Sequence, residues 1–200
     1  MTNRGGFLHK LDPRRYIEFS SPVTLGLALA SLLVLVLHRL TGGAATRALF
    51  AVYRSPLTDP LFYPRLFLHV LGHSNFAHYA ANMGLLLVLG PPMEKRYGSR
   101  AFLLFVALTA LVTGVFHLLL TPHGMALGAS GVVFMLILLS AASGRETGKL
   151  PLTLLLVAAI YLGREIADGV FRKDGVSQLI HVIGGLCGAL IGRLHGKRRL

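Results

Sequence analysis

The 200-residue sequence is poor in acidic residues, lacks tryptophan and contains a single cysteine. Only eight residues are Asp or Glu, against twenty Lys or Arg. Charged residues make up 14% of the chain, whereas a soluble domain typically carries about 25%. Because Cys187 stands alone, no disulfide can form within the chain. The scarcity of charge is concentrated in four runs without Asp, Glu, Lys or Arg, namely 19–38, 66–93, 101–144 and 175–192.

These charge-free runs have the length and apolar character of membrane helices. A span needs about 20 residues, and the run 101–144 is long enough for two helices and a turn. We therefore predict an all-α membrane protein built as a bundle of six transmembrane helices. Their expected ranges are about 21–38, 77–91, 100–120, 128–143, 150–163 and 176–192.

The basic residues predict how this bundle is oriented. With six helices both termini lie on one side, which then holds 13 Lys and Arg residues against seven on the other. Because Lys and Arg collect on the cytoplasmic side, we expect both termini in the cytoplasm. Residues 1–18 and 194–200 become short basic tails of one domain, residues 19–193. The same rule explains the net charge of +12 without any binding to nucleic acid.

The sequence GASG, Gly128 to Gly131, lies in the longest charge-free run. Gly124 before it predicts a loop, and the apolar residues 132–139 after it predict a helix with Ser130 in its first turn. Glycines on both sides allow another group to approach the Ser130 hydroxyl closely. The pattern has a second interpretation, because Gly, Ala and Ser in a membrane segment also mark a close contact between helices.

Polar side chains at a matching depth favour a chemical role for Ser130. At about 1.5 Å per residue, Ser130, His78 and His181 lie about 21, 22 and 16 Å above the inner edge of the membrane. All three positions fall in the outer half of a hydrocarbon core of about 30 Å. Asn82 shares the helix face of His78, four residues away.

Two other roles are open for these polar residues. They can join helices by hydrogen bonds, and His69, His73 and His78 could hold a metal ion. The metal interpretation lacks an HExxH pair, and no acidic residue occurs between Asp59 and Glu94. It is therefore the weaker of the two.

The same residues satisfy the needs of a serine hydrolase. A serine hydroxyl becomes nucleophilic when a base removes its proton, and neutral imidazole does this near pH 7. The oxyanion that follows needs hydrogen-bond donors, which His78 and Asn82 carry, together with the first backbone N–H groups of the Ser130 helix. No carboxylate lies at this depth. The residues therefore predict a dyad of Ser130 and His181 rather than a triad.

Taken together, the motifs resemble those of the rhomboid family of intramembrane serine proteases. The matching segments are HVLGHSNFAHYAANM (69–83), MEKRYGS (93–99), GASG (128–131) and HVIGGLCG (181–188). The resemblance covers about residues 20–193. It implies hydrolysis of a peptide bond in or beside a transmembrane helix of a membrane-protein substrate, with the fifth helix and the loop after it as gate and cap.

The resemblance also implies a role for individual residues. Ser130 would be the nucleophile and His181 the general base, while His78, Asn82 and Ser130 would bind the oxyanion. The positions implied to be structural are Gly128, Gly131, Gly184, Gly188, Glu94 and Arg65. No metal ion or cofactor is implied. The expected partners are transmembrane substrates and the lipid bilayer, and the expected location is the cytoplasmic membrane if the source is bacterial.

The sequence departs from the family pattern at two positions. Phe134 stands where a tyrosine usually packs on the catalytic histidine, so stacking can persist but a hydroxyl hydrogen bond cannot. Pro64 stands where tryptophan often precedes the first-loop arginine. Two rival functions are a catalytically silent rhomboid-like protein that binds or escorts membrane proteins, and a metal or proton transporter that uses the histidines.

Overall fold

The computed structural model describes residues 21–143 and 175–196, together with positions 152, 156, 159, 160 and 163. The elements of this described part are all helices, which confirms the all-α class there. Residues 1–18, most of the predicted helix 150–163 and residues 197–200 lie outside it. The helices are α2 (Pro22–Leu40), α3 (Ala44–Leu49), α4 (Phe62–Leu68), the 3-10 helix η2 (His69–Leu71), α5 (Phe76–Tyr97), α6 (Ser99–Leu120), α7 (Ser130–Ser143) and α9 (Gly175–Gly196).

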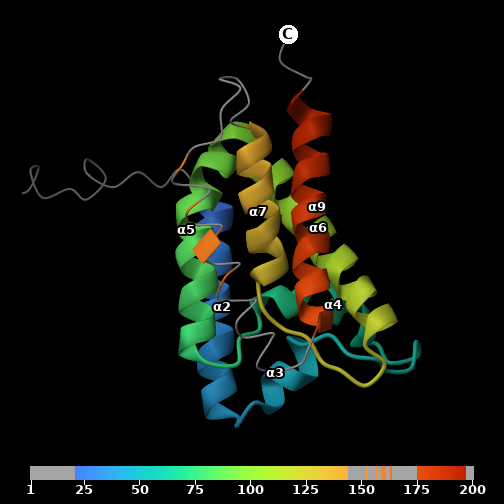
Figure 1. The fold of residues 1–200 in the computed structure, drawn as a ribbon. Coiled ribbons are helices and arrows are strands. Elements are labelled where there is room, and N and C mark those ends of the chain that lie inside the picture. Colours follow the sequence, from blue (N-terminus) through green and yellow to red (C-terminus); the bar gives the residue numbers. More distant parts are fainter. Residues whose placement is uncertain are drawn as a thin grey trace, which may run out of the picture.

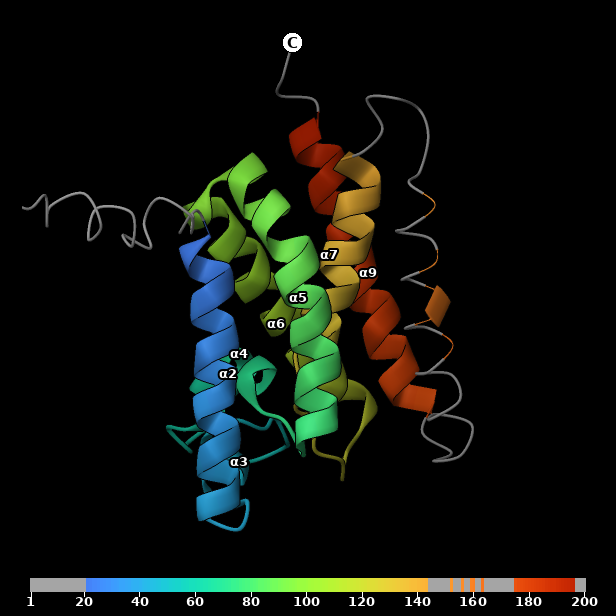
Figure 2. The ribbon, with the colours of Figure 1, turned by 90° about the vertical axis from the view of Figure 1, so that its left-hand side faces the viewer.

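The long helices stand side by side in an upright bundle (Figures 1 and 2). Helices α5, α7 and α9 run in the same direction, and α2 and α6 run in the opposite one. The short helix α3 and the loop that leads into α7 lie at the lower end of the bundle in these views. The N-terminal halves of α5, α7 and α9 therefore face this end, where the predicted polar residues meet.

Helix α7 is the central element of the bundle. It is apolar on all faces, and every residue from Gly131 to Ile137 is buried. A helix without a polar face has to be enclosed by its neighbours, and α5, α6 and α9 all contact it. Aromatic side chains of α6 complete the core beside it, notably Phe102 and Phe105. Ser130 is thus the first residue of the most enclosed helix.

Two of the described helices, α2 and α6, are long and apolar enough to cross a membrane, while α7 is apolar but shorter. The outer surfaces of the bundle are also apolar. Several large side chains are more than half exposed, among them Leu29, Leu33, Leu104, Leu190 and Leu194. Apolar surface of this extent marks a lipid or protein contact. The count of six spanning helices and the cytoplasmic position of both termini stay predictions.

Helix α5 is longer than its sequence predicts. It passes through Pro91 and Pro92 and ends at Tyr97, instead of ending near Pro91. The last turn is held by Glu94, whose carboxylate accepts hydrogen bonds from the backbone N–H groups of Val23 and Thr24 at 2.9 and 2.8 Å. It also accepts the hydroxyl hydrogens of Thr24 and Ser99. These four bonds tie the end of α5 to the starts of α2 and α6.

The connection between α2 and α5 is folded around Arg65. Its buried guanidinium donates to the Ala48 carbonyl at 2.8 Å and to the Asp59 carboxylate at 2.7 Å. It also lies 4.5 Å from the centre of the Tyr53 ring, which is a cation–π distance. Arg65 therefore joins α3, α4 and the loop between them into one unit.

Candidate active site

The loop before α7 is fixed by the connection that Arg65 organises. Val52 and Ala126 exchange two backbone hydrogen bonds of 2.8 and 2.9 Å. The Gly128 N–H donates to the His69 carbonyl at 2.9 Å. Gly128 has a φ of +123°, which a residue with a side chain rarely adopts. This turn leads directly into α7, which begins at Ser130.

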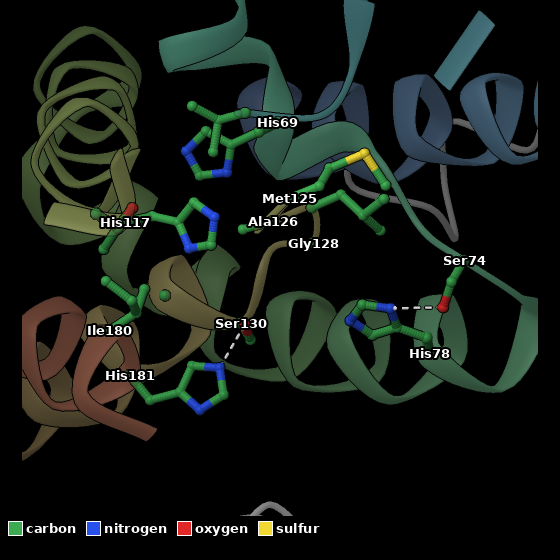
Figure 3. A pocket seen from close by; sticks show the side chains of 14 residues that line it. His69, Ser74, His78, His117, Met125, Ala126, Gly128, Ser130, Ile180 and His181 are labelled. Carbon is green, nitrogen blue, oxygen red and sulfur yellow. Dashed lines mark hydrogen bonds between the residues drawn. The ribbon is translucent and has the colours of Figure 1, made fainter. Parts of the chain in front are cut away.

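Ser130 and His181 lie in direct contact. The His181 Nε2 atom is 2.7 Å from the Ser130 Oγ atom (Figure 3). His181 is buried and Ser130 is half-buried. When Nε2 accepts the hydroxyl hydrogen, the neutral ring carries its own hydrogen on Nδ1, which is the arrangement a general base requires.

Two glycines of α9 permit this contact. A Cβ atom at Gly184 would collide with the backbone of Gly131, next to Ser130. A Cβ atom at Gly188 would likewise collide with the Met135 carbonyl. Gly131 itself has room for little more than hydrogen, because its Cβ would lie 3.0 Å from the Thr113 methyl group. The backbones of α7 and α9 therefore pack against one another without side chains between them.

Phe134 lies against the catalytic histidine candidate. Its ring and that of His181 are nearly parallel, with an interplanar angle of 6° and a distance of 4.9 Å between ring centres. Ser130 and Phe134 are four residues apart, so both side chains point to the same side of α7. Phenylalanine thus keeps the stacking that the sequence left open for this position.

His78 approaches the same site from α5. A Cβ atom at Gly128 would lie 2.8 Å from both Cε1 and Nε2 of His78, so glycine is needed for the ring to lie here. Asn82 is fully buried one turn later, and its side-chain N–H donates to the His78 carbonyl at 3.1 Å. His78 lines the cavity beside Ser130, whereas Asn82 is not part of the lining.

A cavity of about 330 Å³ brings these residues together. This volume is at the lower end of the range for small-molecule and peptide side-chain pockets. The lining is not limited to the residues that the sequence singled out for catalysis. It consists of Val52, His69, Ser74, His78, Thr113, His117, Met125, Ala126, Leu127, Gly128, Ser130, Gly131, Ile180 and His181.

Sequence reasoning missed His117 and Ser74 as members of this site. His117 is a buried histidine of α6, and its place inside a charge-free run was a usable signal, because ionisable residues in membrane segments are commonly functional. Ser74 gave no such signal, since it is an exposed residue in a loop. Among the residues that the structure describes, no three His, Cys, Asp or Glu side chains are grouped so as to hold a metal ion.

The arrangement supplies the parts of an acyl-transfer site. A hydroxyl lies in contact with an imidazole, a second imidazole borders the same cavity, and an amide donates a hydrogen bond to the carbonyl of that second histidine. The cavity provides space for a substrate group next to the hydroxyl. A nucleophile, its base and a source of oxyanion donors are the elements sought in an uncharacterised hydrolase.

Comparison with known proteins identifies the family of this chain. No curated protein matches the chain, but the family model described as the Rhomboid domain matches residues 62–198, well over half of the sequence. Members of this family are integral membrane proteins, most of them intramembrane serine proteases and some of them inactive. The matched range includes the site from α4 to the end of α9. The chain therefore belongs to the rhomboid family.

Proposed function

We propose that this protein is an active intramembrane serine protease. The observation that carries the proposal is the 2.7 Å contact between His181 Nε2 and Ser130 Oγ at the edge of a cavity. An inactive relative would have no need for this pair. The proposed substrates are membrane proteins that are cut in or beside a transmembrane helix.

The proposed reaction proceeds through an acyl-enzyme. His181 Nε2 takes the proton of Ser130 as its oxygen forms a bond to the substrate carbonyl carbon, and the carbonyl π electrons move to the oxygen. The C–N bond then breaks, and the proton passes from His181 to the leaving amine. Water attacks the resulting ester in the same manner, giving a carboxylic acid and free Ser130.

The proposed oxyanion site is formed by His78, Asn82 and the backbone N–H of Ser130. His78 borders the cavity, and the Asn82 amide donates a hydrogen bond to the His78 carbonyl. The N–H of Gly128 is already bonded to His69 and is not part of this set. Loss of one oxyanion donor typically lowers kcat by about 10² to 10³.

The proposed membrane arrangement follows the sequence prediction. Six helices cross the bilayer, residues 19–193 form the protease domain, and both basic tails are cytoplasmic. The apolar outer surfaces of α2, α6 and α9 support contact with lipid. In a bacterial cell, the protein is expected in the cytoplasmic membrane. Most of the residues proposed to gate substrate entry, 150–163 and the loop after them, lie outside the described part of the chain.

The decisive experiment uses the purified full-length chain in lipid vesicles with a transmembrane substrate whose helix contains glycine or proline. Wild type is expected to cleave it, and Ser130→Ala and His181→Ala are expected to be inactive. A fluorophosphonate probe should label Ser130 in wild type and fail to label His181→Ala. Cleavage that survives Ser130→Ala would refute the proposal. Inhibition by a metal chelator would instead favour metal chemistry.

The alternative is a catalytically silent member that binds membrane proteins. It predicts that wild type neither cleaves a panel of helix-weak substrates nor reacts with the probe, while it still captures membrane proteins from vesicles. The same experiment therefore separates the two functions, because probe labelling does not require the natural substrate.

A further inference from the structure

Two residues just before α5 form a closed chain of hydrogen bonds with His78. The Asn75 Oδ1 atom accepts from the backbone N–H of His78 at 2.9 Å and so caps the helix. The Asn75 Nδ2 atom donates to the Ser74 Oγ atom at 3.3 Å. The Ser74 Oγ atom in turn lies 3.3 Å from the Nδ1 atom of His78. Figure 3 shows Ser74 and Ser130 on opposite sides of the His78 ring.

The first hydrogen bond fixes the direction of the second one in this chain. A backbone N–H can only donate, so the amide oxygen of Asn75 must face His78 and the amide nitrogen must face Ser74. That nitrogen can also only donate, so the Ser74 oxygen accepts there. The Ser74 oxygen still carries a hydroxyl hydrogen of its own, and it donates this hydrogen to His78 Nδ1 when that atom is unprotonated.

The opposite edge of the ring faces the catalytic residues. The Nε2 and Cε1 atoms of His78 lie beside Gly128, within 2.8 Å of where a Cβ atom would stand. The ring of His73 packs edge to face on His78 at 5.0 Å between centres and holds its plane. A neutral His78 with an unprotonated Nδ1 therefore carries its hydrogen on Nε2, at the border of the cavity.

We propose that Ser74 and Asn75 are positioning residues that hold neutral His78 in the Nε2–H tautomer. The proposal rests on the protease function proposed above, because the Nε2–H group is the one able to donate to the oxyanion. In the other tautomer a lone pair on Nε2 faces the developing negative charge, and the stabilisation is lost. The helix cap of α5 thus acts on the chemistry through Ser74.

The tautomer is measured directly by ¹⁵N NMR of protein labelled at histidine nitrogens. The Ser130→Ala background removes any dependence on activity, and the spectrum of His78→Gln identifies the His78 signals by subtraction. At pH 8 to 9, where exposed imidazoles are neutral, His78 is expected to bear its hydrogen on Nε2. Ser74→Ala should give a mixture of tautomers, and Ser74→Thr, which retains the hydroxyl, should restore the Nε2–H form.

Asn75→Asp provides a matched test, because aspartate caps a helix about as well as asparagine. One carboxylate oxygen keeps the hydrogen bond from the His78 N–H. The other oxygen replaces the amide nitrogen that donated to Ser74, and it can only accept a hydrogen bond from the Ser74 hydroxyl. The hydroxyl hydrogen of Ser74 then turns to Asp, and its oxygen becomes an acceptor for His78 Nδ1–H. We expect Asn75→Asp to invert the tautomer without unfolding α5.

Kinetics connect the tautomer to the reaction. In the active protein, Ser74→Ala is expected to lower kcat about tenfold, equivalent to about 1.4 kcal/mol, with KM unchanged, and Ser74→Thr should restore it. An unchanged His78 tautomer in both Ser74→Ala and Asn75→Asp would overturn the proposal, as would an altered tautomer with unchanged kcat. If wild type neither cleaves nor labels, the protease function fails, while the NMR spectra still decide whether Ser74 and Asn75 orient His78.

Discussion

A single methyl group at position 184 tests the geometry of the proposed dyad. In Gly184→Ala, the new Cβ atom would collide with the carbonyl oxygen of Gly131 and would lie 2.9 Å from both the carbonyl carbon and the Cα atom of that residue. Ordinary van der Waals contact begins near 3.4 Å, so the two backbones must separate by at least ~0.5 Å to relieve such overpacking. Gly131 is adjacent to Ser130 and position 184 is three residues from His181, so the separation acts on the reacting pair.

The expected loss is large in activity and moderate in stability. A displacement of about 1 Å in a catalytic group can lower the rate about 10²-fold, so kcat should fall between about 10-fold and 100-fold. Overpacking costs about 1–3 kcal/mol of the free energy of unfolding. The measurements are cleavage of a reconstituted transmembrane substrate, the rate of fluorophosphonate labelling of Ser130, and thermal unfolding in detergent.

Two glycine variants separate these effects. Gly192→Ala also overpacks the contact between α7 and α9, against Ala142, but it lies about 12 Å further along the helix from Gly184. It should lose stability and keep most of its labelling rate. Gly84→Ala, inside α5, has no atom within 4 Å of the new Cβ. It should match wild type in cleavage and labelling, and its stability should be unchanged or higher by up to about 1 kcal/mol, because alanine favours a helix over glycine. Wild-type labelling by Gly184→Ala would refute the argument that the glycine contact sets the dyad distance.

Three further predictions concern the supports of the site. Phe134→Leu removes the ring stacked on His181, and kcat should fall about 3-fold to 10-fold, since such pairs contribute about 0.5–1.5 kcal/mol; unchanged kinetics would contradict this. Glu94→Gln replaces the acceptor of four hydrogen bonds by an amide with only one oxygen. Thermal unfolding should show a free energy of unfolding lower by roughly 2 kcal/mol. Lys95→Gln serves as the control at a neighbouring exposed position. The Leu61 N–H and the Arg65 guanidinium lower the pKa of the Asp59 carboxyl. Its stabilising effect is therefore present above the ordinary carboxyl pKa and is lost as pH falls through the lower folded value. Melting curves should show Asp59→Asn less stable than wild type near pH 7, with the difference shrinking as the pH falls below the ordinary Asp pKa of about 3.9.

The sequence predicted most of the long helices because their signal is local. Long charge-free runs identify α2, α6, α7 and α9 within a few residues of their observed ends. The short helices α3 and α4 escaped prediction, because their residues are partly polar and their conformation depends on Arg65 and its distant partners. The end of α5 was also missed, since proline normally ends a helix and the tertiary bonds of Glu94 override that tendency.

The sequence predicted which residues of the candidate site lie at the same depth, because the regular rise of a helix sets the depth of each residue. Ser130, His78 and His181 occupy matching levels because α5, α7 and α9 run in parallel, and the rise of a helix is constant. Depth could not show which atoms of a ring face the cavity. The orientation of His78 depends on Ser74 and Asn75 in a loop, and loop geometry has no comparable periodicity.

Two features fix the position of Ser130: it begins a buried helix, and the loop before it is held by hydrogen bonds to another part of the chain. Helix α7 is buried from Gly131 to Ile137, so its first turn has little freedom to adjust to a substrate. The backbone just before it is held by Val52 and by the carbonyl of His69, which belong to the connection organised by Arg65. Because the precision of a catalytic group depends on the residues that support it, changes in this remote connection should act on the reaction rate before they unfold the bundle. The glycines of GASG therefore allow the backbones to approach closely. The connection between α2 and α5 then fixes the position at which Ser130 contacts His181.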